Sequence, residues 1–227
     1  MQQTTTIPAT PRSAPSPREI EGALRVGDLA FIRIRRSPFR QLADATGTWT
    51  NHVGIVVDLT SSGAVIAESR IPLSRRTAFA AFVRRSEQGR VAVLRLHRLL
   101  EDEEIRRLQC AADGRLGALY DTGFNLHSPR QFCSRFVRKV LQEATGAVLG
   151  EVTSFRELLR RNPQADLRLW KIWYFGRIPW ERATVTPASL YSSPSLRVVF
   201  DGVLRDDADT RPPGVAADQR PNCAKPL

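Results

Sequence analysis

Short runs of apolar residues, many of them alternating with polar ones, occupy four segments in the first half of the chain. The first follows the turn signal Gly27-Asp28 and extends over Leu29–Arg35. The others are His52–Val57, Ala64–Glu68 and Arg90–Leu96, and a Ser-Ser-Gly turn separates the second segment from the third. Runs of this length that are rich in β-branched residues predict strands. Because short connections join them, we expect an antiparallel sheet.

Helical periodicity replaces this pattern in the second half of the chain. Acidic residues at 101–104 predict the start of a first helix, in which apolar residues recur at Ile105, Leu108, Ala112, Leu116 and Leu119. A second helix is predicted over Phe132–Ala144, with Gly146 just beyond it as a C-terminal cap. Ser154 and Glu157 have the spacing of a capping box that begins a third helix. Strands followed by helices predict the α+β class.

Composition divides the chain of 227 residues into one folded domain and two tails. Residues 1–24 are rich in Thr, Pro, Ser and Ala, and residues 206–227 have a similar character. Segments of this kind bury little apolar surface, so both are expected to be disordered. The remaining residues, 25–205, are predicted to form a single domain, and an apolar content of 42% is sufficient for its core.

Charge and hydropathy narrow the function classes. No run of 18 apolar residues occurs that would span a membrane, and the N-terminal stretch lacks the apolar core of a signal peptide. We therefore expect a cytoplasmic protein without an integral membrane segment. The net charge is +11, but the basic residues are dispersed, with the densest groups at 33–40 and 75–85. Without an aromatic-rich basic ribbon or zinc-finger spacing, nucleic acid is not expected as a partner.

The cysteines and histidines are few and widely spaced: Cys110, Cys133, Cys223, His52, His97 and His127. No CxxC or HxxxH pair occurs among them, so neither a disulfide framework nor a structural zinc site is expected. No metal or other cofactor is predicted. Thiol chemistry remains, in which the fold brings together one Cys, one His and a polar third residue.

Cys133 stands at the predicted start of the second helix. Unpaired backbone N–H groups and the helix macrodipole favour an anion at this position, which lowers the pKa of a thiol. The same N–H groups can bind the oxyanion that forms during acyl transfer. A buried cysteine that packs as a small hydrophobic side chain is the commoner alternative for a lone Cys, and position alone leaves both interpretations open.

His52 and Glu68 lie at the ends of two successive predicted strands. From a strand end, an imidazole can reach a thiolate and keep it ionised, and a carboxylate beside the ring can fix its tautomer and orientation. Taken singly, a structural histidine and a solvated carboxylate are the simpler interpretations. His127 is a rival base six residues before Cys133, although a loop residue that close rarely reaches over a helix start. His97 is interpreted as a surface residue at a strand end.

Five short motifs follow one another in the order of a known enzyme group. They are Val26-Gly27-Asp28-Leu29, Asn51-His52-Val53-Gly54-Ile55-Val56, Ala67-Glu68-Ser69, Tyr120-Asp121-Thr122-Gly123-Phe124 and Phe132-Cys133-Ser134-Arg135-Phe136-Val137. In this order they resemble the YebB/YiiX-type permuted papain-like group of the NlpC/P60 superfamily. A later stretch, with Trp170, Trp173 and Trp180-Glu181-Arg182, is similar to YebB proteins in particular. The resemblance covers about residues 25–200.

The resemblance implies a circularly permuted papain-like fold, an α+β domain in which the antiparallel sheet that carries the His comes first and the Cys helix later. It also implies that Cys133 is the nucleophile, that His52 is the base and that Glu68 orients His52. Tyr120 and Trp49 are expected to contact the substrate. The family includes peptidases and amidases that act on peptidoglycan and, among permuted relatives, acyltransferases and lipid-directed enzymes.

The predicted function is therefore that of a bacterial cysteine hydrolase that cleaves an amide, peptide-like bond through a thioester intermediate. A lipid-directed acyltransferase or esterase with the same three residues is the first alternative, so the expected substrate is either peptide-like or an acyl compound. A non-catalytic binding module is the second alternative. It is disfavoured because the Cys, the His and the Glu are all present.

The segment 169–182 holds three of the four tryptophans, together with Tyr174, Phe175 and flanking basic residues. Such rings either cover the sheet as part of the core or contact an acyl chain or a membrane surface. The lack of clear helical spacing favours a core position, in which both Trp170 and Trp173 are buried. Peripheral membrane contact remains the alternative.

Overall fold

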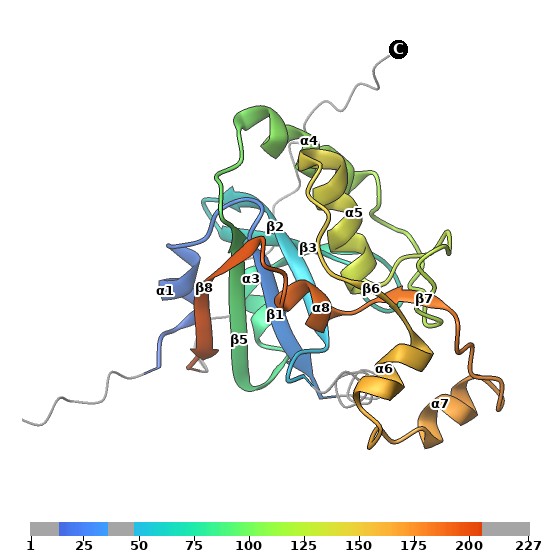
Figure 1. Ribbon diagram of the computed structural model, residues 1–227. Helices are drawn as coiled ribbons and strands as arrows, with labels where there is room; N and C mark the ends of the chain where they lie inside the picture. The colour runs from blue at the N-terminus through green and yellow to red at the C-terminus, as the bar shows by residue number, and fades with distance from the viewer. Residues whose placement is uncertain (1–13, 36–47, 206–227) are drawn as a thin grey trace, which may run out of the picture.

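The computed structural model describes residues 14–35 and 48–205 of the chain. Its centre is an antiparallel sheet of six strands in the order β4-β3-β2-β1-β5-β8 (Figure 1). These strands are β1 Leu29–Ile34, β2 His52–Thr60, β3 Gly63–Glu68, β4 Arg75–Ala78, β5 Ser86–Leu96 and β8 Leu196–Val203. A separate antiparallel pair consists of β6 Val152–Ser154 and β7 Ala183–Val185.

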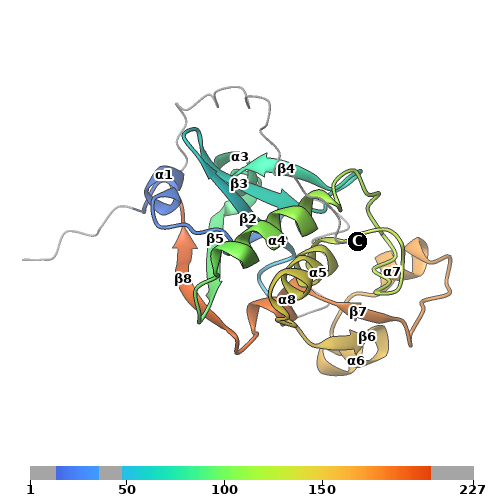
Figure 2. The same ribbon diagram turned by 90° about the horizontal axis from the view of Figure 1, so that it is seen from above.

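Helices cover both faces of the sheet. On one face lie α4 Asp102–Asp113 and α5 Cys133–Thr145, which contact β2, with α8 Pro187–Tyr191 next to α5. On the other face lie α1 Pro17–Glu21 and α3 Phe79–Val83. Two more helices, α6 Phe155–Arg161 and α7 Arg168–Trp173, lie together to one side of the sheet, at the far end of the molecule from β8 (Figure 1, Figure 2).

The central strand β1 shows how its residues supply both cores. Leu29 and Phe31 belong to the core beneath α4 and α5, whereas Ala30 and Ile32 belong to the core beneath α1 and α3. All four side chains are fully buried. Successive side chains of a strand point to opposite faces, so an unbroken apolar run is what a strand covered on both sides requires.

Asp28, in the turn before β1, is fully buried and held by an ion pair. Arg95 of β5 donates two hydrogen bonds to its carboxylate, at 2.6 and 2.7 Å, and the backbone N–H of Arg25 donates a third at 2.9 Å. Breaking such a buried pair costs roughly 3–5 kcal/mol because it leaves an uncompensated charge. The Gly-Asp turn of the sequence therefore fixes the start of β1 to β5.

The helix α5 presents a continuous apolar face to the sheet. Phe136, Val137, Val140 and Leu141 recur at helical spacing and are fully buried. The helix is capped by Gly146, whose φ of 73° is the left-handed conformation that Gly adopts without penalty. Both the helix and its cap agree with the sequence prediction.

The predicted fold class is confirmed, since an antiparallel sheet precedes the Cys-bearing helix. The four predicted strands correspond to β1, β2, β3 and β5, and the three predicted helices to α4, α5 and α6. The helix α4 is shorter than predicted. It ends at Asp113 before the capping residue Gly114, so Leu116 and Leu119 lie outside it.

The sequence patterns did not predict several short elements, among them β4, α3, α7 and α8. The helices α3 and α8 have five residues each and α7 has six, which is fewer than two helical turns. Hydrophobic periodicity cannot appear in so short a window. Packing against the sheet and its neighbours sets the positions of these elements.

The N-terminal boundary of the domain lies earlier than predicted. Ser16 and Glu19 form a capping box for α1, and Ile20 and Leu24 are buried in the core beneath α1 and α3. Two apolar side chains in a polar stretch are therefore enough to attach residues 14–24 to the domain. The rest of the predicted N-terminal tail, 1–13, and the predicted C-terminal tail, 206–227, lie outside the described residues.

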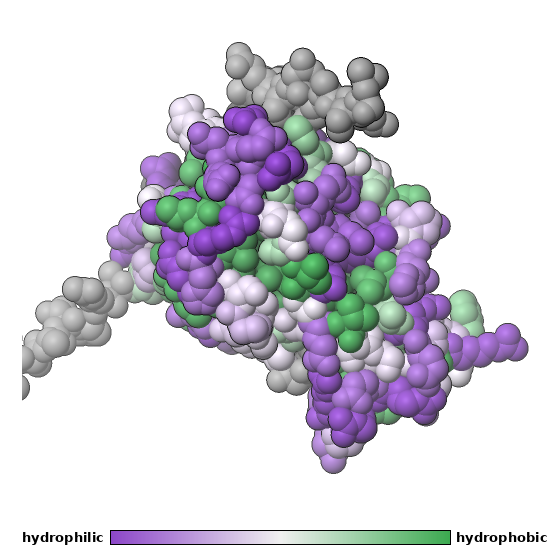
Figure 3. Space-filling model, turned by 45° about the horizontal axis from the view of Figure 1, so that its top comes forward, coloured by the Kyte–Doolittle hydropathy of each residue, from purple (hydrophilic) through white to green (hydrophobic). Residues whose placement is uncertain are grey.

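None of the helices in the described ranges is long and apolar enough to cross a membrane. Figure 3 shows one face of the molecule, on which hydrophilic residues predominate and hydrophobic residues form small patches between them. Scattered apolar side chains are normal on a protein surface. A cluster of exposed apolar side chains next to a strained backbone is less common, and such a cluster lies on α7 and the turn after it.

Candidate active site

Hydrogen bonds to β1 fix the start of β2 and so position His52. The Thr50 hydroxyl donates to the backbone carbonyl of Ile32 at 2.9 Å. The Asn51 side chain accepts a hydrogen bond from the backbone N–H of Ile34 at 2.7 Å and donates one to its carbonyl at 2.9 Å. His52 itself is fully buried. The polar residues that precede it in the sequence are therefore anchors for the strand end.

His52 and Glu68 form a hydrogen-bonded pair across two neighbouring strands. The Nε2 atom of His52 lies 2.6 Å from a carboxylate oxygen of Glu68. The register pairs Ile55 of β2 with Ala67 of β3, which places Glu68 diagonally opposite His52 on the same face of the sheet. Because Nε2 faces Glu68, Nδ1 is the ring nitrogen that remains for Cys133.

Two further side chains hold the Glu68 carboxylate. The Thr77 hydroxyl of β4 donates to one oxygen at 2.7 Å, and Arg85 donates to both oxygens at 2.8 and 2.7 Å. Burial by itself raises the pKa of Glu68, but His52 and Arg85 outweigh it and lower the pKa from 4.5 to about 2. Glu68 is therefore negatively charged at every pH at which the protein is expected to work.

Phe82 of α3 covers the His52 ring. The two ring centroids are 5.6 Å apart with an interplanar angle of 30°, and the Arg85 guanidinium lies 4.9 Å from the same Phe82 centroid. Gly54 makes room for this packing. A Cβ at Gly54 would lie 3.0 Å from the Phe82 ring and would overlap the Ile66 side chain. The Gly of the His-Val-Gly segment is thus required for close packing behind His52.

Cys133 is the first residue of α5, preceded by Phe132 in extended conformation as the N-cap. Its thiol is free and buried. The backbone N–H groups of Val53 and Ser134 lie near the sulfur, as does the His52 side chain from β2. The Ser134 hydroxyl donates to the Val185 carbonyl at 2.7 Å, which fixes the helix start to β7.

The charges of Cys133 and His52 stabilise each other. Burial alone raises the pKa of the Cys133 thiol, but the hydrogen bond and charge of His52 and the backbone N–H groups lower it below 9.0. Burial alone lowers the pKa of His52, but Cys133 and Glu68 raise it above 6.5. Both shifts favour the thiolate–imidazolium pair over the neutral pair, and the thiolate is the nucleophilic form.

Tyr120 reaches the thiol from the loop before α5. It forms an isolated parallel bridge with Gln131, two residues before Cys133, and the Asp121 N–H donates to the Gln131 carbonyl at 2.6 Å. The Tyr120 hydroxyl lies near Cys133. Burial, reinforced by the thiolate charge, raises the pKa of Tyr120 well above 10.0, so the hydroxyl remains a donor. Tyr120 therefore lies beside the thiol, and its contact with a substrate stays a prediction.

The other predicted site residues have different surroundings. His97 and His127 are exposed, whereas the thiol is buried beside His52. Trp49 packs edge-on against Tyr191 of α8, with ring centroids 6.0 Å apart, and a β5 guanidinium lies 4.8 Å from its ring. These contacts join Trp49 to α8 and β5, and its part in substrate binding stays a prediction.

Sequence analysis missed Thr77, Phe82 and Arg85. Arg85 belongs to the dense arginine group at 75–85, but nothing in the pattern separates it from its exposed neighbour Arg84. Thr77 and Phe82 lie in β4 and α3, two elements that the pattern did not predict. Only the pairing of β4 with β3 and the packing of α3 bring these three side chains to His52 and Glu68.

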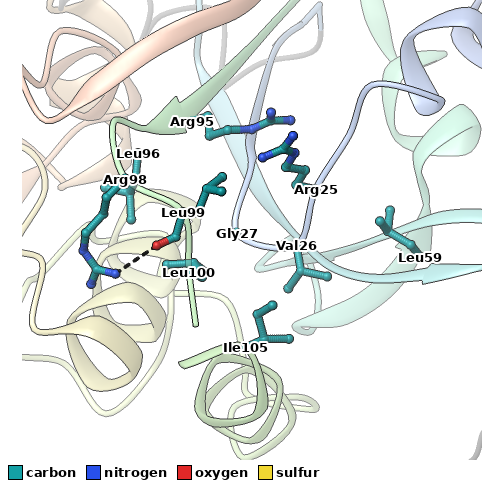
Figure 4. Close-up of a pocket in the computed structure, with 10 residues that line it drawn as sticks. All are labelled: Arg25, Val26, Gly27, Leu59, Arg95, Leu96, Arg98, Leu99, Leu100 and Ile105. Atoms are coloured by element: carbon teal, nitrogen blue, oxygen red, sulfur yellow. Dashed lines mark hydrogen bonds between the residues drawn. The ribbon is translucent and has the colours of Figure 1, made fainter. Parts of the chain in front are cut away.

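The catalytic candidates are covered in this structure: Cys133 is 1% exposed, and His52 and Glu68 are 0% exposed. A cavity of about 290 Å³ lies elsewhere, between the turn before β1, the end of β5 and α4, with Leu59 and Ile105 among its walls (Figure 4). Leu59 lies seven residues beyond His52 on β2, which is about 20 Å along a strand. This cavity is therefore separate from the thiol.

A helix that begins with a cysteine, next to a histidine and a carboxylate on adjacent antiparallel strands, defines the papain-like class of proteins. Because the sheet precedes the helix in this chain, the class is the circularly permuted form. The chain belongs to the permuted papain-like amidase enzymes of the YaeF/YiiX, C92 family, whose model matches residues 23–200. The resemblance inferred from the five motifs is confirmed.

Two proteins of Escherichia coli are similar to this chain. The protein YiiX of strain K12, described as uncharacterized, is 30% identical over 175 residues, which are 77% of this chain and 85% of that protein. The crystal structure of YiiX from strain O157:H7 matches with a TM-score of 0.72 and 28% sequence identity. The match covers 79% of this chain and 98% of that chain.

The description of that crystal structure calls YiiX a metalloprotein. Within residues 14–35 and 48–205 of the present chain, no group of three or more His, Cys, Asp or Glu side chains could hold a metal ion. The Glu68 carboxylate is bound by His52, Thr77 and Arg85, and the Arg85 charge opposes a cation there. The described residues do not fit a metal site, and we derive no catalytic step through a metal ion.

Proposed function

We propose that this protein is a cysteine-dependent amidase that cleaves a peptide-like amide bond through a thioester on Cys133. The observation that carries the proposal is the position of His52, which is hydrogen-bonded to Glu68 at 2.6 Å and lies close enough to the buried Cys133 thiol for each group to shift the pKa of the other. A histidine held in this way has one ring nitrogen for orientation and the other for proton transfer. Membership of an amidase family supports the same reaction.

Acylation begins when the Cys133 thiolate attacks the amide carbonyl carbon and forms a C–S bond. The oxyanion that results is stabilised by backbone N–H groups at the start of α5. As the tetrahedral intermediate collapses, the C–N bond breaks and His52 donates its Nδ1 proton to the leaving nitrogen. The amine leaves neutral, His52 becomes neutral, and the acyl group remains on Cys133 as a thioester.

Deacylation uses water as the second reactant. Neutral His52 accepts a proton from the water molecule as its oxygen attacks the thioester carbonyl. The C–S bond then breaks, which releases the carboxylic acid and restores the thiolate–imidazolium pair. Glu68 stays negatively charged throughout and stabilises the imidazolium without transferring a proton. Tyr120 donates its hydroxyl proton in a hydrogen bond to the substrate near the sulfur.

The test compares variants on matched substrates. The full-length protein is incubated with a panel of peptide amides and with the corresponding oxygen esters, and acyl adducts are sought by mass spectrometry of peptides. Cys133→Ala should lower turnover by about a thousandfold or more while the melting temperature holds. The control is His127→Ala, which changes an exposed histidine and should leave turnover intact.

Each result has a defined consequence. Amide cleavage by the wild type, with an acyl adduct on Cys133 and no cleavage by Cys133→Ala, supports the proposal. Amide cleavage that survives in Cys133→Ala contradicts it. Ester cleavage without amide cleavage would replace it with the lipid-directed esterase or acyltransferase. A folded protein with an unreactive thiol and no turnover would favour a binding module.

A further inference from the structure

Large apolar side chains of α7 and the turn after it are exposed to solvent. Ile172 is 74% exposed, Phe175 is 92% exposed and Trp173 is 38% exposed. The basic residues Lys171 and Arg177 flank them, and we call these five residues the α7 tip. The sequence analysis expected both Trp170 and Trp173 in the core. Only Trp170, at 3% exposure, is there.

The backbone holds Phe175 in an unfavourable conformation. Its φ is 51°, in the left-handed region, and Gly176 follows with a φ of 78°. The N–H groups of these two residues close the helix end by donating to the carbonyls of Ile172 at 3.1 Å and Lys171 at 2.6 Å. Gly is the usual residue at such a helix end, and another residue there costs about 1–2 kcal/mol. An almost fully exposed Phe buries nothing that would offset this cost.

The opposite side of the same segment is firmly attached to the domain. Trp170 packs against Phe124 with ring centroids 6.0 Å apart and stacks with Tyr174 at 6.3 Å. The Tyr174 hydroxyl donates to the carbonyl of Gly123 at 3.0 Å, and the Trp173 indole N–H donates to that of Thr122 at 3.1 Å. The α7 tip is therefore a fixed projection rather than a frayed helix end.

The charge of the α7 tip is positive. Residues 167–177 contain no Asp or Glu. Asp166, just before this segment, is paired with Arg168 at 2.8 Å. Lys171 and Arg177 are exposed and have no ion-pair partner among the residues that the structure describes. Exposed apolar rings between unpaired cationic side chains complement a surface that is apolar inside and anionic at its rim.

We propose that the α7 tip docks on an anionic lipid surface, with Phe175 and Ile172 inserted among the acyl chains and with Lys171 and Arg177 at the headgroups. A protein partner would need about 800 Å² on each side of a stable interface, whereas three projecting side chains offer far less. Insertion into lipid needs only a few apolar groups when basic residues assist. The proposal does not rest on the amidase reaction.

Docking at this tip would bring the membrane close to the candidate active site. Phe124 contacts Trp170 on one side and, on the other, packs against Tyr120 at 6.3 Å and Phe132 at 5.8 Å. Tyr120 lies near Cys133. One aromatic side chain therefore separates the buried base of α7 from the residues that surround the thiol. Figure 1 shows α7 and the start of α5 on the same side of the molecule.

The test is co-sedimentation of the full-length protein with vesicles of phosphatidylcholine alone and of phosphatidylcholine mixed with phosphatidylglycerol. We expect binding to the anionic vesicles that weakens as salt is added. The double variant Ile172→Ser, Phe175→Ser should lower vesicle affinity by about tenfold or more. Because both side chains are exposed, its melting temperature should stay close to that of the wild type.

A matched control is available on β8, at the opposite end of the molecule (Figure 2). Val198 is 56% exposed and Arg197 beside it is also exposed. The double variant Arg197→Gln, Val198→Ser should bind anionic vesicles as the wild type does. The corresponding change on α7, Lys171→Gln with Arg177→Gln, should weaken binding to anionic vesicles.

Three outcomes would overturn the proposal. The first is no vesicle binding by the wild type, and the second is equal binding by the wild type and the Ile172→Ser, Phe175→Ser variant. The third is self-association that this variant abolishes without any vesicle binding, which would assign the α7 tip to a second copy of the chain. Amidase turnover on water-soluble substrates should be unchanged in the variant, so the two proposals fail separately.

Discussion

Replacing Glu68 by Gln removes the charge behind His52 while keeping the shape of the side chain. Glu68 is 0% exposed, and its carboxylate is bound by His52, Thr77 and Arg85. These partners lower its pKa from 4.5 to about 2. A pKa difference of this size between the folded and unfolded states corresponds to about 3 kcal/mol of stability. The variant Glu68→Gln should lose stability of this order near neutral pH.

The loss should depend on pH with a definite sign. A carboxyl group whose pKa is lowered on folding contributes its full stability above the unfolded pKa of 4.5 and loses it as the pH falls toward 2. At pH 3 only about 1 kcal/mol of this contribution remains in the wild type. The difference in unfolding free energy between wild type and Glu68→Gln should therefore shrink between pH 7 and pH 3.

The assay is urea denaturation of both proteins at several pH values, followed by circular dichroism. Glu157→Gln is the matched control. The pKa of Glu157 is also lowered to about 2, by Arg160 and Arg161, but both arginines are exposed and the Glu157 side chain is 29% exposed. Solvent screens such a pair, so this variant should change stability little at any pH.

Equal losses in Glu68→Gln and Glu157→Gln, or a loss that stays constant with pH, would contradict the electrostatic role assigned to Glu68. Measuring turnover provides an independent test of the role of Glu68. If Glu68 orients His52 and stabilises its charge, Glu68→Gln should lower turnover less than Cys133→Ala does. Equal loss of turnover in the two variants would instead give Glu68 a direct role in proton transfer.

Three further predictions concern the same framework. His52→Ala should raise the pH midpoint of thiol alkylation toward about 8.5, whereas His127→Ala should not, as measured by iodoacetamide labelling against pH; the reverse order would contradict the assignment of the base. Trp170→Ala should cost about 3–5 kcal/mol in urea denaturation and Trp173→Ala distinctly less, because only the first ring is buried; equal losses would contradict this. Gly54→Ala should cost about 1–3 kcal/mol of stability by overpacking the space behind the imidazole. An unchanged melting temperature would contradict this and would mean that the Ile66 and Phe82 side chains shift without cost.

The local pattern of apolar and polar residues was sufficient to predict the long strands and helices. An unbroken apolar run predicts β1 because it is buried on both faces, and helical spacing of Phe136, Val137, Val140 and Leu141 predicts α5 because one face packs on the sheet. The shorter helices could not be predicted in this way. Each has too few residues for a period to appear, and each is held by contacts with elements distant in the sequence.

The candidate site was likewise only partly predictable from the sequence. A helix start is visible in the sequence, and with it the reason why Cys133 could be anionic. The end of β2 is visible as well, and with it His52. The Trp170–Phe175 segment could not be predicted in this way. Its irregular spacing favoured a core position for its rings, whereas in the structure Trp170 is buried and Phe175 is exposed.

The α+β class, the order of sheet and helix, and the residue types from which a thiol site could be built were all predictable from the sequence. These are properties of consecutive residues, since periodicity, caps and turns act within a few positions. Which charged groups lie next to one another depends instead on how the distant segments pack. The pKa of Glu68 depends on Arg85, and that of Cys133 depends on His52 on another element. Electrostatic interactions fall off with distance in space, not along the chain, so no local pattern could reveal them.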